Sequence, residues 1–160
     1  MNSLVARIAE LGQSIWLDYV RRSLIESGQL QKMIEQDDLR GLTSNPAIFE
    51  EAISRSNDYE EVIFSLAQAS YCAEEIYQTI AIEDVQRAAE SFFPTYQKTK
   101  GMDGYVSLEV SPTLAYDTEG TILEARKLWR RLNRPNVMVK IPGTREALPA
   151  IQQLLAKAST

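Results

Sequence analysis

The chain lacks histidine altogether and has a single cysteine, Cys72, among its 160 residues. Without histidine it has neither the commonest zinc ligand nor the base of a Ser-His-Asp triad. One cysteine cannot form an intrachain disulfide or a cysteine-built metal site, and it favours an intracellular setting. We therefore expect no metal and a cytoplasmic location. Catalysis would rest on Lys, Asp, Glu, Ser, Thr, Asn, Tyr or Arg side chains.

An excess of positive charge is also missing, because 17 Lys and Arg face 22 Asp and Glu, a net charge of −5. This charge does not favour nucleic acid or an anionic membrane as a partner. No run of about 18 apolar residues and no cationic-then-apolar leader is present, so neither a membrane span nor secretion is expected. The glycine-rich loops that bind nucleotides are absent too, and we expect no cofactor.

The composition that remains is ordinary for a soluble globular protein, with 44% hydrophobic and 24% charged residues. A chain of this length is long enough to bury a core and normally forms one domain. No repeat, low-complexity tract or interdomain linker divides it. We expect residues 1–160 to form a single domain.

Four short stretches rich in apolar residues are predicted as strands, at residues 14–20, 39–43, 105–110 and 137–141. Apolar residues at helical spacing predict helices over residues 2–11, 21–36 with a break at Gly28, 117–132 and 144–157. Residues 46–104 form a much longer segment that should hold several helices. Strands that alternate with helices predict an α/β fold of parallel βα units under right-handed crossovers.

Several helix boundaries and faces follow from single residues. Asn45 before Pro46 is typical of a helix start, and Asp58 with Glu61 suggests another. Pro94 and Gly101 should end the long helical segment. In the last two helices the following residues are expected on or near the core side: Ile122, Leu123, Ala125, Leu128 and Trp129, then Leu148, Ile151 and Leu155.

Each predicted strand ends on a residue that can take part in chemistry. These residues are Asp18, Thr43 with Asn45 just beyond it, Glu109 and Lys140. In βα folds the active site lies at the carboxyl ends of the strands and draws on several of them. The sequence therefore predicts that these side chains converge on one pocket.

Each of these residues also has a purely structural interpretation. Asp18 or Asn45 could cap the helix that follows it, and Glu109 could pair with a surface arginine. Lys140 could be an edge-strand lysine whose stem runs to the solvent. These interpretations do not explain why suitable residues recur at the same position of four strands, and that recurrence favours a site.

A lysine near two carboxylates, with no nucleotide motif, points to imine chemistry on a carbonyl substrate. Burial disfavours the charged form of a lysine and so makes a neutral, nucleophilic amine available. The iminium that forms can accept electrons when the adjacent C–C bond breaks, while a carboxylate removes the hydroxyl proton. This sequence of steps is an aldol reaction.

Four stretches resemble the N-terminal half of the transaldolase family, and its longer bacterial branch in particular. They are Ile15–Asp18 (IWLD), Gly41–Pro46 (GLTSNP), Gly104–Pro112 (GYVSLEVSP) and Val139–Thr144 (VKIPGT). The resemblance implies the first half of a (β/α)8 TIM barrel. It also implies the transfer of a dihydroxyacetone unit between sugar phosphates of the fructose 6-phosphate and sedoheptulose 7-phosphate class, in the pentose phosphate pathway.

The same resemblance implies a role for each residue at the strand ends. Lys140 would form the Schiff base, and Asp18 would be the acid and base at the C4 hydroxyl of the substrate. Glu109 would act with a water molecule during imine formation. Asn45 and Thr43 would hydrogen-bond the substrate or its supporting groups.

Transaldolases continue through four more strands, which supply further substrate contacts and the basic phosphate site. This chain ends about where a fifth strand would begin. A half-barrel leaves two bare edges and an apolar inner face. We therefore expect a truncated product, or a piece of a homo-oligomer or of a complementing half-barrel pair. Two alternatives to transaldolase activity are a catalytically silent half-barrel that oligomerises and a stand-alone aldolase that uses the same lysine.

Overall fold

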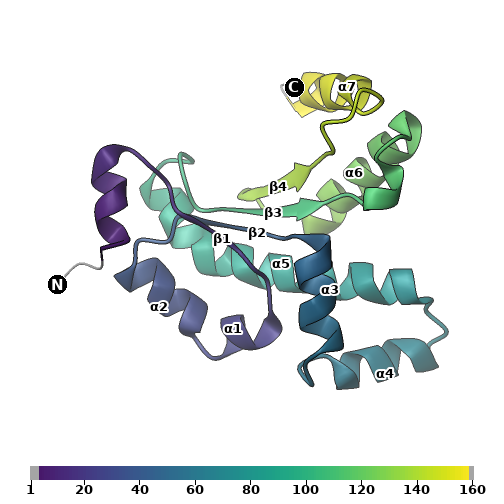
Figure 1. Ribbon diagram of the computed structural model, residues 1–160, viewed down its shortest axis with the longest axis horizontal. Helices are drawn as coiled ribbons and strands as arrows, with labels where there is room; N and C mark the ends of the chain where they lie inside the picture. Colours follow the sequence, from purple (N-terminus) through teal and green to yellow (C-terminus); the bar gives the residue numbers. More distant parts are fainter. Residues whose placement is uncertain (1–3, 159–160) are drawn as a thin grey trace.

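The computed structural model describes residues 4–158 (Figure 1). The strands are β1 (Trp16–Asp18), β2 (Gly41–Thr43), β3 (Tyr105–Glu109) and β4 (Val137–Lys140). The α-helices are α1 (Arg22–Glu26), α2 (Gln29–Gln36), α3 (Pro46–Ser54), α4 (Glu60–Gln68), α5 (Ala73–Lys98), α6 (Thr118–Leu132) and α7 (Leu148–Ala158). Two 3-10 helices are η1 (Ala6–Leu11) and η2 (Pro112–Leu114). The predicted leading helix is thus a 3-10 helix, and residues 2 and 3 of that prediction lie outside the described part.

The four strands form one parallel sheet in the order β1-β2-β3-β4. Each strand therefore lies beside the one that precedes it in the chain, whereas a doubly wound sheet would reverse its order. The sheet is not closed within the described residues, and β1 and β4 are its edges. This architecture is that of half a TIM barrel and confirms the predicted fold class.

One face of the sheet packs against helices and forms the core. Figure 1 shows α1, α2 and α5 beneath the sheet and α6 and α7 at its β4 end. Successive residues of a strand point to opposite faces, and parallel partners share a face. The helix side carries Leu42, Val106, Leu108 and Val137, all buried, and α5 contributes Ile80, Val85 and Phe92.

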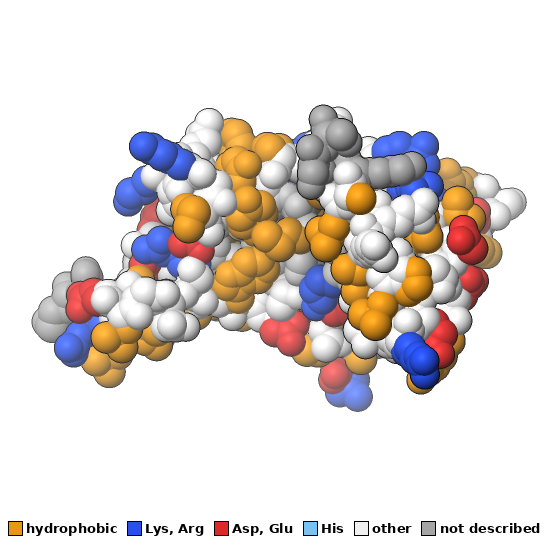
Figure 2. Space-filling model, turned by 90° about the horizontal axis from the view of Figure 1, so that it is seen from above, with side chains coloured by type: hydrophobic (Ala, Val, Ile, Leu, Met, Phe, Trp, Pro, Cys, Tyr) orange, Lys and Arg blue, Asp and Glu red, His pale blue; other side chains and the backbone are white. Residues whose placement is uncertain are grey.

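The opposite face, which we call the open face, carries the alternate residues of each strand, those that do not point to the helices. Trp16 and Tyr105 lie in one row of this face, and Asp18 and Thr43 lie in the next row toward the carboxyl ends. Seen from above, hydrophobic side chains gather over the middle of the molecule, with charged groups beside them (Figure 2). In the carboxyl-end half of this face Asp18, Thr43, Glu109 and Lys140 are polar and Met138 is apolar, so the expected apolar inner face is found there only in part.

The longest helix, α5, runs for 26 residues and includes Pro94. Pro94 was expected to end the helical segment, but α5 continues past it to Lys98. The chain leaves the helix at Lys100 and Gly101, which have positive φ values of 55° and 80°. Left-handed backbone stops a helix, whereas Pro94 removes one backbone hydrogen bond and crowds the preceding turn without ending α5. Among the described residues, no helix is long and apolar enough to cross a membrane.

Asp58 does not begin a helix, contrary to the expectation. Its carboxylate binds the Arg21 guanidinium through both oxygens, at 2.7 and 3.2 Å, and also accepts from the Ser23 N–H. These hydrogen bonds, that of Arg21 above all, lower the pKa of Asp58. The Asp58 carboxylate thus binds Arg21 instead of capping a helix. The helix α4 begins two residues later, without a side-chain cap.

A buried polar cluster ties the segment after β1 to α5. Asp84 of α5 has no solvent exposure, accepts from the Tyr59 hydroxyl at 2.8 Å and pairs with Arg22 at 2.9 Å. The Tyr59 hydroxyl in turn accepts from the Arg22 backbone N–H. Burial raises the pKa of Asp84, and hydrogen-bonded partners offset that cost. The cluster fixes where the chain enters α1, four residues beyond the end of β1.

The predicted inward faces of α6 and α7 are only partly correct. Ile122, Ala125 and Leu128 are buried, whereas Leu123 and Trp129 are mostly exposed. In α7 the buried residue is Ala150, and Leu148 and Leu155 lie largely in solvent. These exposed side chains belong to α6 and α7, the two helices at the β4 end of the sheet.

Candidate active site

The residues predicted to act in chemistry all lie at the carboxyl ends of the strands. Asp18, Thr43, Glu109 and Lys140 are the last residues of β1, β2, β3 and β4, respectively. Asp18 is in register with Thr43, and Glu109 with Lys140. All four belong to the open face, so the sheet presents them at one edge and on one side.

Lys140 is at the centre of the closest contacts. Its Nζ donates to Thr43 Oγ1 at 2.8 Å and to the Ser44 carbonyl at 3.0 Å, and it forms a salt bridge with Glu109. Its side chain is 38% exposed, so a small carbonyl compound could reach the amine. The salt bridge excludes the interpretation of Glu109 as the partner of a surface arginine. The contacts likewise exclude a Lys140 stem that simply runs to the solvent.

Ser107 is a member of this cluster that the sequence reasoning missed. It lies in the middle of β3, is 2% exposed, and donates from Oγ to Thr43 Oγ1 at 2.9 Å. The sequence did contain an indication of this role. Ser107 is a hydroxyl between two apolar residues of a buried strand, and it lies two positions before Glu109 and hence on the same face. The backbone of Ser44 also takes part, through its carbonyl oxygen.

Asp18 remains apart from the lysine cluster. Its carboxylate is exposed and, within the described residues, has no hydrogen bond or ion pair to another side chain. The helix that follows, α1, begins after Arg21, so Asp18 is not its cap. Asp18 is on the open face next to Thr43, which leaves its carboxylate available to a substrate that spans the strand ends.

Asn45 caps α3, as one interpretation predicted. Its Oδ1 accepts from the N–H groups of Ala47 at 3.1 Å and Ile48 at 3.5 Å, and Pro46 occupies the first helical position. The amide Nδ2 makes no hydrogen bond within the described residues. Asn45 can therefore cap the helix with its oxygen and donate to a ligand with its nitrogen.

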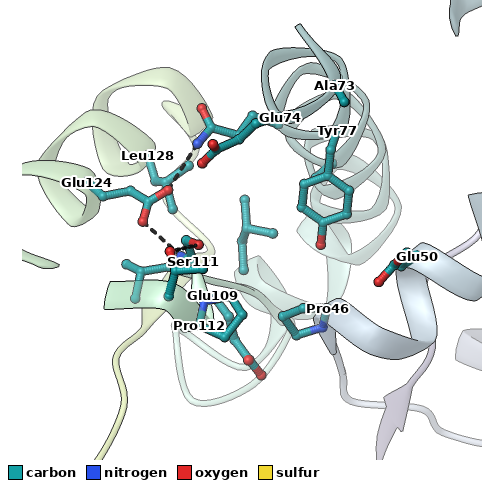
Figure 3. Close-up of a pocket in the computed structure, with 15 residues that line it drawn as sticks. Pro46, Glu50, Ala73, Glu74, Tyr77, Glu109, Ser111, Pro112, Glu124 and Leu128 are labelled. Atoms are coloured by element: carbon teal, nitrogen blue, oxygen red, sulfur yellow. Dashed lines mark hydrogen bonds between the residues drawn. The ribbon is translucent and has the colours of Figure 1, made fainter. Parts of the chain in front are cut away.

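A cavity of about 450 Å³ lies beside Glu109, between α5, α6 and the end of β3 (Figure 3). Its walls include Ala81, Leu108 and Leu128, and its acidic groups are Glu50, Glu74, Glu109 and Glu124. No Lys or Arg is among the described residues that line it. A phosphate group would meet only like charge there, so we do not expect this cavity to hold one.

Tyr77 reaches into this cavity from α5 (Figure 3). Burial, followed by the negative charges of Glu109 and Glu50, raises the pKa of Tyr77 to about 12. The phenol therefore stays protonated at neutral pH and can donate a hydrogen bond. On the α6 side, Glu124 accepts from the Ser111 N–H at 2.8 Å and from Gln78 at 3.0 Å.

Comparison with known proteins identifies the family. The family model Transaldolase/Fructose-6-phosphate aldolase matches residues 15–159. Transaldolase of Trichodesmium erythraeum is 47% identical over 150 residues, which are 94% of this chain and 40% of that protein. Transaldolase of Thiobacillus denitrificans is 44% identical, over 92% of this chain and 41% of the relative. Transaldolase of Thermobifida fusca is 43% identical, over 98% of this chain and 43% of the relative.

The chain thus spans about 40% of the length of these curated relatives. The matched part contains every strand of the sheet and all of the predicted site residues. The sequential parallel strands, the lysine cluster at their carboxyl ends and the family match agree. The chain belongs to the transaldolase and fructose-6-phosphate aldolase family.

Proposed function

We propose that the chain carries out transaldolase-type transfer of a dihydroxyacetone unit between sugar phosphates, through a Schiff base at Lys140. The observation that carries this proposal is the position of the Lys140 amine at the strand ends, held by three acceptors, one of which is Glu109. The names of the curated relatives support the reaction class. The proposed substrates belong to the fructose 6-phosphate and sedoheptulose 7-phosphate class of the pentose phosphate pathway.

Imine formation begins with the loss of one proton from the Lys140 ammonium. Glu109 is the only anionic group among the three acceptors, so it takes this proton. The amine lone pair then attacks the substrate ketone and forms a carbinolamine. Glu109, acting with a water molecule, returns a proton to the departing hydroxyl, and water leaves as the iminium forms.

Asp18 acts in the next step. Its carboxylate removes the proton of the C4 hydroxyl, the C3–C4 bond breaks, and the bonding electrons pass into the iminium to give an enamine. The aldose phosphate is released. Attack of the enamine on an acceptor aldehyde, with Asp18 returning the proton, gives a new iminium. Hydrolysis of this iminium by water releases the product ketose phosphate and regenerates the Lys140 amine. The exposed carboxylate, without an ion pair in the described structure, is consistent with this role.

Thr43 and Asn45 serve as positioning and binding groups in this proposal. Thr43 accepts one Lys140 N–H and so limits the rotation of the amine. Asn45 donates from Nδ2 to a substrate oxygen while its Oδ1 remains on the helix cap.

The test is borohydride trapping with fructose 6-phosphate, followed by mass spectrometry of the digested protein. We expect an adduct on Lys140 in the wild-type chain, none in Lys140→Ala, and an unchanged yield in Lys127→Ala. Lys127 lies on the outer helix α6 and binds Gln78, so it is a matched surface control. A wild-type chain that gives no adduct on Lys140 would be catalytically silent, and this would overturn the proposal.

Aldol cleavage without transfer is a second candidate, because the matching family model names fructose-6-phosphate aldolase as well. The two activities differ in their need for an acceptor. A transaldolase turns over fructose 6-phosphate only when an aldose phosphate acceptor is present. Release of more than one equivalent of glyceraldehyde 3-phosphate per chain without any acceptor would favour the aldolase.

The open sheet also leads us to propose that the chain functions as a homo-oligomer or together with a complementing half-barrel. Two strand edges that are unpaired within the described residues, and the exposed Leu148 of α7, support this proposal. We propose a cytoplasmic location, because the lone cysteine suits a reducing compartment. We propose that neither nucleic acid nor a membrane is a partner.

A further inference from the structure

Ser107 has a buried hydroxyl whose hydrogen bond is made inside the site. The side chain is 2% exposed, and its neighbours on the strand, Val106 and Leu108, point to the apolar core. A buried hydroxyl is costly unless it is hydrogen-bonded. Ser107 makes its bond to Thr43 Oγ1, at 2.9 Å, across two neighbouring strands.

The hydrogen bonds around Thr43 are compatible with one arrangement of its proton. Thr43 Oγ1 lies 2.8 Å from Lys140 Nζ, 2.9 Å from Ser107 Oγ and 3.3 Å from the Ser44 carbonyl oxygen. An ammonium can only donate and a carbonyl can only accept. The Thr43 proton therefore points to Ser44, and its two lone pairs receive Lys140 and Ser107.

We propose that Ser107 is a positioning residue, which acts through Thr43 to orient the Lys140 amine for attack. By donating to Thr43, Ser107 holds the hydroxyl as an acceptor of one Lys140 N–H. The Ser44 carbonyl accepts a second N–H of the Lys140 ammonium, so the third N–H faces Glu109. The lone pair therefore appears in that direction when the proton leaves.

Without the Ser107 hydroxyl, Thr43 can rotate its proton among several directions, and the amine loses its fixed orientation. The number of acceptors around the ammonium does not change, so the effect falls on the rate of attack by Lys140. This inference rests on the proposed function, because it assigns Lys140 as the nucleophile. Its size should be that of one hydrogen bond between neutral groups, about a fivefold change in rate.

The test is competitive acetylation of the whole chain with acetic anhydride, read by mass spectrometry at Lys140 and normalised to the exposed Lys32. We expect Ser107→Ala to slow acetylation of Lys140 by about fivefold and Ser107→Cys, which keeps the volume and a weak donor, to slow it less. In a Thr43→Val background, Ser107→Ala should have no further effect on the acetylation rate, because Ser107 acts on Lys140 only through the Thr43 hydroxyl.

An unchanged Lys140 rate in Ser107→Ala would overturn the proposal. So would an equal loss in the Thr43→Val background, because that result indicates a general packing effect. Should Ser107→Ala fail to fold, Ser107→Cys carries the same comparison. A parallel trapping reaction with dihydroxyacetone and borohydride separates the Schiff-base proposal from the Ser107 proposal. If Lys140 is acetylated but never trapped, the Schiff base is contradicted. The comparison of acetylation rates between the Ser107 variants stays valid in that case.

Discussion

Asn45 combines a structural and a chemical group in one side chain. The oxygen caps α3, and the nitrogen makes no hydrogen bond in the described structure. Aspartate is as good a cap as asparagine but lacks the N–H donors. The two functions can therefore be separated by substitution at this position.

We predict that Asn45→Asp keeps the free energy of unfolding close to that of the wild type but weakens trapping by fructose 6-phosphate. Asn45→Ala should lower the free energy of unfolding by about 1 kcal/mol and weaken trapping as well. Urea unfolding and the substrate dependence of borohydride trapping measure the two effects. Equal trapping by Asn45→Asp and the wild type would contradict a substrate contact.

Asp18 is proposed to act after the imine has formed. Asp18→Asn should therefore still form a Lys140 adduct with fructose 6-phosphate, but the C–C bond should stay intact. Mass spectrometry after borohydride treatment should find the adduct of the whole sugar phosphate in the variant, and the smaller dihydroxyacetone adduct in the wild type. Detection of the smaller adduct in Asp18→Asn would assign the base to another residue.

The identities of the strand-end residues could be predicted from the sequence because each strand is short and its last residue is polar. The grouping of Lys140 with Glu109 and Thr43 follows from neighbouring strands in sequential order. Ser107 escaped prediction because a serine within a strand, even on the same face as Glu109, does not by itself indicate a site. Its role depends on the register that brings it opposite Thr43.

At the level of the elements, the pair of Arg21 and Asp58 links the segment before α1 to the segment before α4. The pKa of Asp58 is lower in the folded chain than its usual value, because Arg21 and then Ser23 hydrogen-bond the charged form. A lowered carboxyl pKa stabilises the fold above the unfolded pKa, and this stability is lost as the pH falls.

We predict that the difference in free energy of unfolding between the wild type and Asp58→Asn is constant above about pH 5 and shrinks toward about pH 3. Arg21→Gln should show the same pH dependence relative to the wild type, since it removes the partner of the same carboxylate. Urea unfolding across this pH range checks both. A difference that does not change with pH would contradict the pairing of these residues in solution.

Helix boundaries and faces were less predictable than the strands, for identifiable reasons. The capping pattern at Asp58 was outweighed by a guanidinium 37 positions earlier in the chain, which no local pattern reveals. Of the two residues expected to end α5, Pro94 was tolerated inside the helix, whereas Gly101 lies with Lys100 in the left-handed backbone that follows its end. The face of α7 was misjudged because Leu148 and Leu155 follow helical spacing, whereas the side of α7 that is buried in the described fold is that of Ala150.

At the level of the whole molecule, the open sheet leaves β4 as an edge strand with Met138 on its open face. We predict concentration-dependent association of the chain in sedimentation velocity experiments. Met138→Lys should weaken that association, since a lysine on an edge strand opposes pairing with another chain. Lys127→Ala serves as the control for a change of surface charge. A compact monomer at every concentration would contradict the proposed assembly.

The strand order has a further consequence for the synthesis of the chain on the ribosome. Every pairing in the sheet joins a strand to the one translated just before it. When β2, β3 or β4 leaves the ribosome, its partner has already emerged, so the sheet can grow in the order of translation without waiting for a distant segment. Each added unit leaves one strand edge free to receive the next strand.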